Sequence, residues 1–154
     1  MLLSGNFSLS ELTKSQTALR NGLDNTPSTE EIVALTVLST KILQPIRDKY
    51  GSFTPNSGFR TIELCKLVGS SEKSQHAKGE AADIEVTGVD NHELAKWISK
   101  NLEFDQLILE FYASGDPSSG WVHVSHSRTK AKQRGQILHT VVKGKKVEYK
   151  QGLL

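Results

Sequence analysis

The sequence predicts a single α+β domain in which helices pack against one face of an antiparallel sheet. Apolar residues recur at helical spacing between residues 28 and 50, and shorter runs of strand character follow from residue 82 onward. These patterns are typical of an amphipathic helix and of half-buried strands. The chain has 154 residues, enough to bury a core without disulfides or a structural metal. We therefore expect residues 1–154 to form one domain.

Helices are expected in three places. A capping-box pattern at residues 8–11 opens a short helical stretch that ends near Gly22. The same pattern at residues 28–31 opens the main core helix, which runs to about residue 50 with a bend near Pro45. A third helix is expected over residues 90–101, with its apolar side chains turned toward the core.

The strands are expected at residues 82–86, 106–112, 121–125, 137–142 and 146–149. Gly144 lies between the last two runs and predicts a hairpin turn. The Ser/Gly/Pro-rich residues 114–120 predict a loop between two strands.

Strand periodicity places three polar side chains on one face of this sheet. Residues two apart on a strand point to the same side. Asp83 therefore opposes the apolar Ile84, His123 opposes Val124, and Glu110 lies opposite the leucines of its strand. If the apolar faces pack on the helices, the three polar side chains emerge together on the other face.

His76 can reach the same place from the turn before the first strand, where Gly79 permits unusual backbone angles. Two imidazoles and one carboxylate are the ligand set of a catalytic zinc site that keeps one position open for water. We therefore expect Zn²⁺ as cofactor and a hydrolytic reaction. A nearby carboxylate would act as general base. Glu110 is the first candidate and Glu85, which shares the face of Asp83, is the second; otherwise Glu110 is a solvated residue or a partner of Arg60.

The segments 74–83, with the letters SQHAKGEAAD, and 121–125, WVHVS, resemble the zinc D-Ala-D-Ala peptidase family. This family includes D-alanyl-D-alanine carboxypeptidases and phage endolysins. The triplet 58–60, GFR, is similar to the segment upstream of the family's first ligand. The resemblance extends over about residues 7–125 and is strongest to the phage-encoded carboxypeptidase-type members. It implies a Hedgehog/D-Ala-D-Ala peptidase-like fold with the zinc site on one face of the sheet.

Residue by residue, the resemblance implies His76, Asp83 and His123 as zinc ligands. It also implies Arg60 as the cation that binds the substrate's carboxylate or carbonyl oxygen, and Ser74 as a hydrogen-bond partner of the substrate.

The sequence departs from the family pattern at two positions. Several relatives have an acidic base three residues before the last histidine, where this chain has Gly120. Others have a histidine where this chain has Trp121. The assignment of the base to Glu110 therefore depends on strand periodicity and on its match to the phage-type subgroup.

Several aromatic and histidine residues near the motif have open roles. Trp121 and Tyr112 either line the cleft and stack on substrate or serve as packing aromatics. His126 is opposite to His123 in strand periodicity, so we expect a surface or cleft-edge position rather than a fourth ligand. His92 and His139 receive no site role.

The predicted function is zinc-dependent hydrolysis of peptidoglycan peptide bonds, at a bond involving D-alanine. Glu110 and Arg60 would be the catalytic residues. The alternative is a non-catalytic, zinc-stabilised module that binds peptidoglycan or belongs to a virion. Endo or exo cleavage and a D,D or L,D bond remain open alternatives.

Composition excludes several other classes. A net charge of +2 gives no broad cationic field, and no recognition motif accompanies it, so we expect no nucleic-acid partner. The basic residues between 128 and 146 form a solvated surface or attach the protein to an anionic cell-wall polymer. No stretch reaches the roughly 20 apolar residues of a membrane span.

The cellular setting follows from weaker signals. The single Cys65 rules out an internal disulfide and suits a reducing compartment. The first residues lack the features of a signal peptide. We expect synthesis in the cytoplasm and action at the bacterial cell wall, as for a phage-encoded or virion-associated protein. Oligomeric state stays open, with a monomer as the default.

Overall fold

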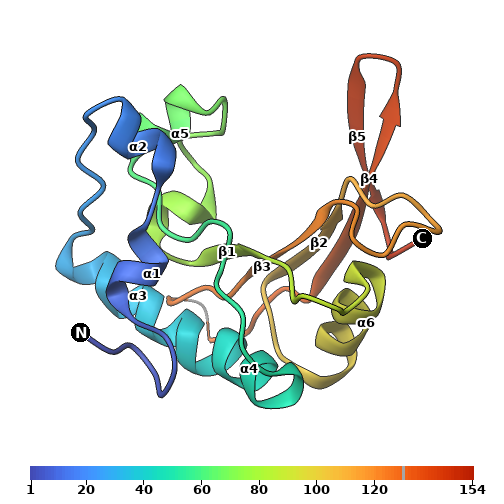
Figure 1. The fold of residues 1–154 in the computed structure, drawn as a ribbon, viewed down its shortest axis with the longest axis horizontal. Helices are drawn as coiled ribbons and strands as arrows, with labels where there is room; N and C mark the ends of the chain where they lie inside the picture. Colours follow the sequence, from blue (N-terminus) through green and yellow to red (C-terminus); the bar gives the residue numbers. More distant parts are fainter. Residues whose placement is uncertain (130) are drawn as a thin grey trace.

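A five-stranded sheet forms the centre of the molecule and separates a helix-covered face from an open one (Figure 1). The structure is a computed structural model and describes residues 1–129 and 131–154. Its strands stand in the order β1-β3-β2-β4-β5. Their bounds are β1 Ala81–Ile84, β2 Gln106–Glu110, β3 Trp121–Ser125, β4 Gln136–Lys143 and β5 Lys146–Gln151.

The sheet is mixed, so the expectation of a purely antiparallel sheet is wrong. β3 pairs antiparallel with both β1 and β2, and β4 pairs antiparallel with β5, but β2 and β4 are parallel. The reason lies in the strand order. Both edges of β3 are occupied, and the outer edge of β1 carries an isolated bridge between Ser57 and Asp83, so the next strand joins at the free edge of β2. Because the chain reverses after β3, which itself runs opposite to β2, β4 runs parallel to β2.

The expected helix over residues 28–50 is present as one helical stretch with an altered middle. It consists of α3 Thr29–Leu38, the π-helical segment η1 Ser39–Leu43 and α4 Gln44–Tyr50. The π-helical segment ends at Leu43, two residues before Pro45, which lacks an N–H and cannot make the regular α-helical bond. The helix expected from residue 90 is α6 Asn91–Asn101, with Asp90 as its N-cap.

The N-terminal helical stretch is split into α1 Leu9–Thr13 and α2 Gln16–Arg20. Ser15 separates them because its side chain accepts a hydrogen bond from the N–H of Ala18 and caps the second helix. The sequence prediction missed two further short elements, α5 Ile62–Leu67 and the 3-10 helix η2 Gln75–Lys78. Within the described residues, no helix has the length and apolarity needed to cross a membrane.

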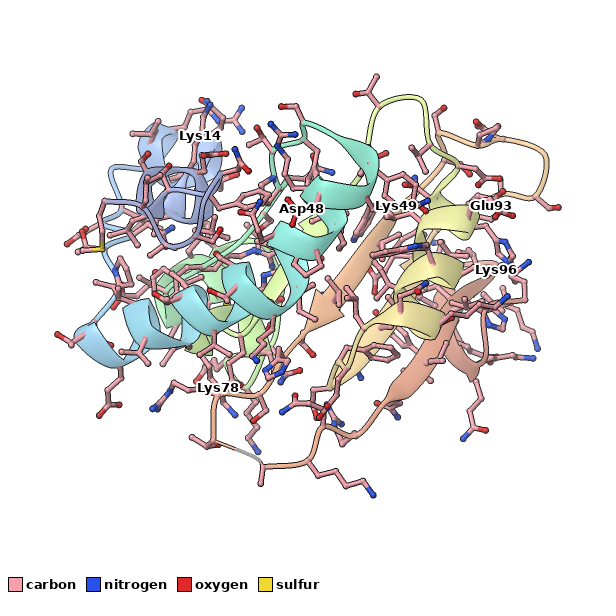
Figure 2. All side chains as sticks on the ribbon, turned by 90° about the horizontal axis from the view of Figure 1, so that it is seen from below. Lys14, Asp48, Lys49, Lys78, Glu93 and Lys96 are labelled. Atoms are coloured by element: carbon pink, nitrogen blue, oxygen red, sulfur yellow. The ribbon has the colours of Figure 1, made fainter. Side chains whose placement is uncertain are left out.

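The core lies between the sheet and the helices α3, α4 and α6, as expected from strand periodicity. Figure 2 views this side from below, with Asp48, Lys49, Glu93 and Lys96 on the helix surfaces. Removing the inward side chains from water is the main stabilising term. The buried residues include Ala82, Ile84, Leu107, Leu109, Val122 and Val124 from the strands, and Leu35, Leu38, Ile42, Ile46, Leu94 and Ile98 from the helices.

The buried carboxylate of Asp105 joins three segments that frame the open face of the sheet. It accepts hydrogen bonds from Gln75 at 3.1 Å and from Arg134 Nη2 at 2.9 Å, Nε at 3.1 Å and the backbone N–H at 3.0 Å. Burial alone would raise the pKa of Asp105, but its contacts with Arg134 and Gln75 lower the pKa below the ordinary value. The ion pair thus ties the start of β2 to η2 and to the approach of β4.

Gly79 allows η2 to pack closely against α3. It adopts a left-handed conformation with φ of +73°, and an added Cβ would lie 2.6 Å from the carbonyl oxygen of Glu31 and 3.2 Å from Leu35 Cγ. Only glycine takes this conformation without strain. The contact matters for the open face because Gly79 lies between His76 and Asp83.

We expect Gly79→Ala to destabilise the protein more than Gly88→Ala. Both glycines have positive φ, but a Cβ at Gly88 meets nothing within 4 Å. The strain of a left-handed alanine should cost about 1 kcal/mol at either site. Gly79→Ala adds a clash with the α3 backbone, so its loss should be larger by about 1–3 kcal/mol. Urea unfolding measures both, and equal losses would contradict this close packing.

Asp105→Asn should lower the free energy of unfolding at neutral pH by about 2 kcal/mol, because hydrogen bonds to a charged carboxylate are lost. The pKa of Asp105 is lower in the folded than in the unfolded chain. Its stabilisation is therefore present above the unfolded pKa and is lost as pH falls through the folded one. The difference between wild type and Asp105→Asn should shrink in acid. Urea unfolding between about pH 7 and pH 3 tests this, and a pH-independent difference would refute it.

Candidate metal centre

Asp83 and His123 face each other across the pairing of β1 with β3. They are partners in the strand register, and Ile108 of β2 continues the same row. Their neighbours Ile84 and Val122 are also paired and fully buried on the helix side. Burial of those apolar partners therefore fixes both polar side chains on the open face.

His76 enters from the 3-10 helix η2, and its ring orientation is fixed by the backbone. Ser74 caps this helix and accepts a hydrogen bond from the His76 N–H at 3.2 Å. The ring nitrogen Nδ1 lies 2.7 Å from the carbonyl oxygen of Gly58. A carbonyl can only accept, so Nδ1 carries the proton and Nε2 keeps its lone pair. That free nitrogen faces Asp83.

The structure brings His76, Asp83 and His123 together with the spacing of a zinc site. Asp83 Oδ1 lies 3.4 Å from His76 Nε2 and 3.1 Å from His123 Nδ1, and one ligand atom from each residue lies within 4.8 Å of the others. Tetrahedral zinc with bonds of about 2.0–2.1 Å would separate its ligand atoms by about 3.3 Å. The donor set and its spacing therefore fit a zinc ion with three protein ligands.

The electrostatics keep Asp83 ionised and available as a ligand. Burial alone would raise the pKa of Asp83, but its contacts with His123 and His76 hold this pKa well below its ordinary range. Its second oxygen, Oδ2, accepts from Arg60 Nη2 at 3.0 Å. Arg60 thus orients the carboxylate and leaves Oδ1 toward the histidines.

Arg60 is itself held at the edge of the site. Its Nε donates to Ser57 at 2.8 Å and its Nη1 to Ser70 at 3.4 Å. The side chain is 17% exposed and lines the same cavity as the cluster. It is therefore close enough to act on Asp83 and on a bound substrate.

Glu110 lines this cavity from the end of β2. Burial raises the pKa of Glu110, and although His123, Arg60 and a hydrogen bond from Tyr149 oppose the shift, the pKa stays above its ordinary value. A carboxylate with a raised pKa is a stronger base while it remains ionised. The structure therefore places Glu110 in one cavity with the three candidate ligands. Strand periodicity predicted this shared face.

Gly120, where several relatives have an acidic residue, has no room for a side chain. Its φ is +64°, and an added Cβ would collide with the carbonyl oxygen of Glu110. The next residue, Trp121, is the register partner of Glu110. Gly120 itself does not line the cavity, whereas Glu110 and Trp121 do.

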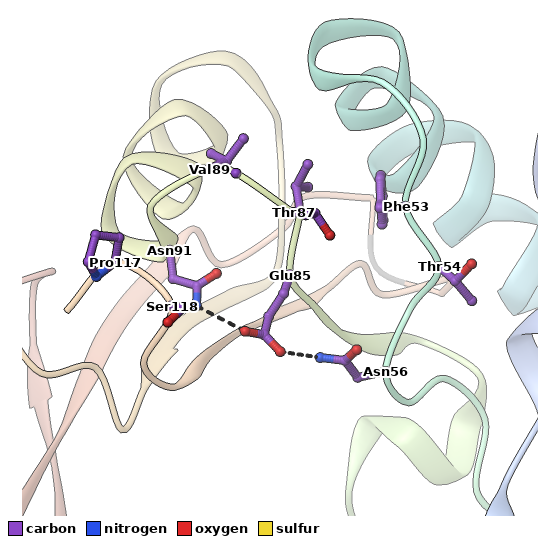
Figure 3. Close-up of a pocket in the computed structure, with 11 residues that line it drawn as sticks. Phe53, Thr54, Asn56, Glu85, Thr87, Val89, Asn91, Pro117 and Ser118 are labelled. Atoms are coloured by element: carbon purple, nitrogen blue, oxygen red, sulfur yellow. Dashed lines mark hydrogen bonds between the residues drawn. The ribbon is translucent and has the colours of Figure 1, made fainter.

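Glu85, the second candidate for the general base, does not line the cavity that contains His76, Asp83 and His123. β1 ends at Ile84, and the Glu85 carboxylate accepts hydrogen bonds from Asn56 at 2.8 Å and from Asn91 at 3.4 Å. Figure 3 shows these contacts in a separate pocket that also includes Pro117 and Ser118.

Of the two aromatic residues considered as cleft residues from the sequence, one lines the cavity and the other packs elsewhere. Trp121 lines the cavity, but Tyr112 does not. Phe111 has a positive φ of 52°, which ends the strand alternation, and Tyr112 turns toward His92 and the core instead. Phe111 lines the cavity and packs against Trp121 with a centroid separation of 5.3 Å.

The cavity has a volume of about 650 Å³. The segment at the end of α5 contributes Val68, Gly69 and Ser70 to its lining, and Phe111 and Tyr149 also line it. Ser74 also lines it, whereas His126, His92 and His139 do not. The sequence analysis missed Tyr149. Its place at the cavity depends on the pairing of β5 with β4 and of β4 with β2, which no local pattern shows.

His76→Ala and Asp83→Ala should each weaken zinc binding by at least about a hundredfold, because each removes one of three protein ligands. Wild type should hold about one zinc per chain after dialysis against the metal. His92→Ala, on α6 and outside the cavity, is the matched control and should keep its zinc. Metal analysis by mass spectrometry measures this. A folded wild type that binds no zinc would exclude the site.

Comparison with known families agrees with this geometry. A sequence profile of the family described as Peptidase M15 matches residues 5–125. The match covers α1 to β3 and includes all three candidate ligands, whereas β4 and β5 lie beyond it. Curated proteins gave no match. The family is that of the zinc-dependent D-Ala-D-Ala peptidases, which supports a metallopeptidase with a peptide substrate. The profile spans most of the chain, and the chain therefore belongs to the Peptidase M15 family.

Proposed function

We propose that this protein hydrolyses peptide bonds of peptidoglycan, at a bond involving D-alanine. The observation that carries the proposal is the convergence of the three ligands with Glu110 and Arg60 in one cavity. When bound there, zinc would lower the pKa of a water molecule to about 7 and polarise the scissile carbonyl.

In this mechanism Glu110 is the general base. Its carboxylate accepts the proton of the attacking water and passes it to the leaving amine. Its raised pKa favours both steps because the group accepts a proton readily and then releases it to a stronger base. Tyr149, which lines the same cavity, is placed to limit the orientations of the carboxylate.

Arg60 and Ser74 bind and orient the substrate. Arg60 keeps one contact with Asp83, and its cationic side chain offsets negative charge on the substrate's carbonyl or carboxylate oxygen. The Ser74 oxygen accepts from the His76 N–H, so its hydroxyl hydrogen is free to donate to the substrate. Trp121 and Phe111 offer a surface on which the peptide can pack.

The place of action follows from the substrate. Peptidoglycan lies outside the cytoplasmic membrane, so the protein acts at the bacterial cell wall. A phage-encoded origin would account for delivery of such an enzyme by another factor.

Glu110→Gln should retain its zinc and lose turnover by about 10²–10⁴-fold, because the amide cannot take the water's proton. Glu85→Gln is the control, since that carboxylate lies in another pocket. The assay uses zinc-loaded protein on defined peptidoglycan, with fragments identified by mass spectrometry. The mass differences name the bond that is cleaved.

Two outcomes would change the assignment. Full activity of Glu110→Gln together with loss in Glu85→Gln would transfer the role of base to Glu85. Wild-type protein that binds insoluble peptidoglycan but releases no new amino termini would instead be a non-catalytic binding module.

A further inference from the structure

The hairpin of β4 and β5 lies outside the segment that matches the family, yet it reaches the metal cavity. It extends beyond the rest of the sheet on the side opposite α2 and α5 (Figure 1). Tyr149 of β5 lines the cavity together with His123 and Glu110. Burial and the Glu110 charge raise the pKa of Tyr149, so its phenol stays protonated beside the Glu110 carboxylate.

The strand register shows which hairpin side chains share the face of Glu110. Ile108 faces the cavity and pairs with Leu138, so Thr140 continues that face two residues later. Thr140 pairs with Tyr149, and Val142 pairs with Val147 in the following row. These side chains therefore continue the open face of the sheet along the hairpin.

An apolar strip results, consisting of Phe111, Tyr149, Val142 and Val147. Their exposed fractions are 42%, 54%, 55% and 43%, although each is a large apolar side chain. Single exposed apolar residues are ordinary, but a contiguous group that begins in a cavity marks a binding surface. Nothing among the described residues covers this strip.

The charges around the strip indicate the chemistry of its partner. Residues 143–150 contain four lysines and one glutamate. Lys143 pairs with Glu148 at 3.6 Å, whereas Lys145 and Lys146 make no ion pair with any described residue. By the same register, the Lys143–Lys146 pair and Lys150 point to the opposite face, so the positive charge surrounds the tip of the hairpin rather than lining the strip. An apolar strip that ends at a cationic tip suits a partner that carries apolar groups and carboxylates.

We propose that the apolar strip binds the uncleaved peptidoglycan polymer on one side of the scissile bond. This inference rests on the proposed function, because that function supplies the polymer as substrate. Peptidoglycan peptides carry carboxylates and alanine methyl groups, which match the lysines and the strip. Tyr149 belongs both to the strip and to the cavity lining, so the two surfaces are continuous. A peptidoglycan strand bound there would pass the three candidate ligands and continue along the hairpin. The protein then cleaves within the polymer rather than only at a free chain end.

The test uses the isosteric substitutions Val142→Thr/Val147→Thr, which add polarity but keep strand propensity. They are made in the Glu110→Gln background, so that binding is measured without turnover. Co-sedimentation with insoluble peptidoglycan should weaken by about tenfold, as for an interface that loses its central apolar contacts. Val33→Thr, a 48% exposed valine on α3, is the matched control and should bind as the parent does.

A second measurement compares substrates in the background with Glu110 intact. The double variant should lose about tenfold in kcat/KM on the polymer and little on a short soluble peptide with the same bond. A general structural defect would reduce both rates. If the double variant does not fold, as judged by circular dichroism, Val147→Thr alone replaces it.

The outcomes separate this inference from the proposed function. A parent that binds peptidoglycan through the hairpin but cleaves nothing would retain the inference and refute the enzymatic function. A double variant that binds and cleaves the polymer like its parent would overturn the inference, as would a parent that does not bind the polymer.

Discussion

The rest of the site depends on the contacts of the Asp83 carboxylate. One of its oxygens lies next to His76 and His123, and the other accepts from Arg60. These partners come from η2, β3 and the segment before α5, which share no local connection in the sequence. Burial of the neighbouring apolar strand residues fixes Asp83 on the open face. Packing of the core therefore also determines how the site assembles.

Strand periodicity predicted the part of the site that regular structure determines. A polar residue between buried aliphatic residues must face away from the core, which is why Asp83, His123 and Glu110 emerge together. His76 was placed by its motif, and Gly79 allows its short helix to pack on α3. The same reasoning placed the apolar face of the sheet against the helices.

Periodicity failed where the regular backbone stops. Tyr112 leaves the open face because Phe111 adopts a positive φ, and Glu85 leaves it because β1 has already ended. The parallel pairing of β2 with β4 depends on which strand edges are already occupied, a long-range property that local patterns do not encode. The short helices α5 and η2 depend on single caps, Thr61 and Ser74, and present too few turns for a helical period.

The proposed base depends on a part of the chain that the family match does not include. Gly120 leaves no side chain at the position where relatives have an acid, and Glu110 approaches the cluster from the neighbouring strand instead. A carboxylate at a strand end has several accessible rotamers, and a partner that restricts them improves its alignment for proton transfer. Tyr149, which belongs to the hairpin, lines the same cavity as Glu110 and is placed to be that partner. In the proposed mechanism the hairpin therefore contributes to the catalytic site, because its Tyr149 lines the cavity together with Glu110.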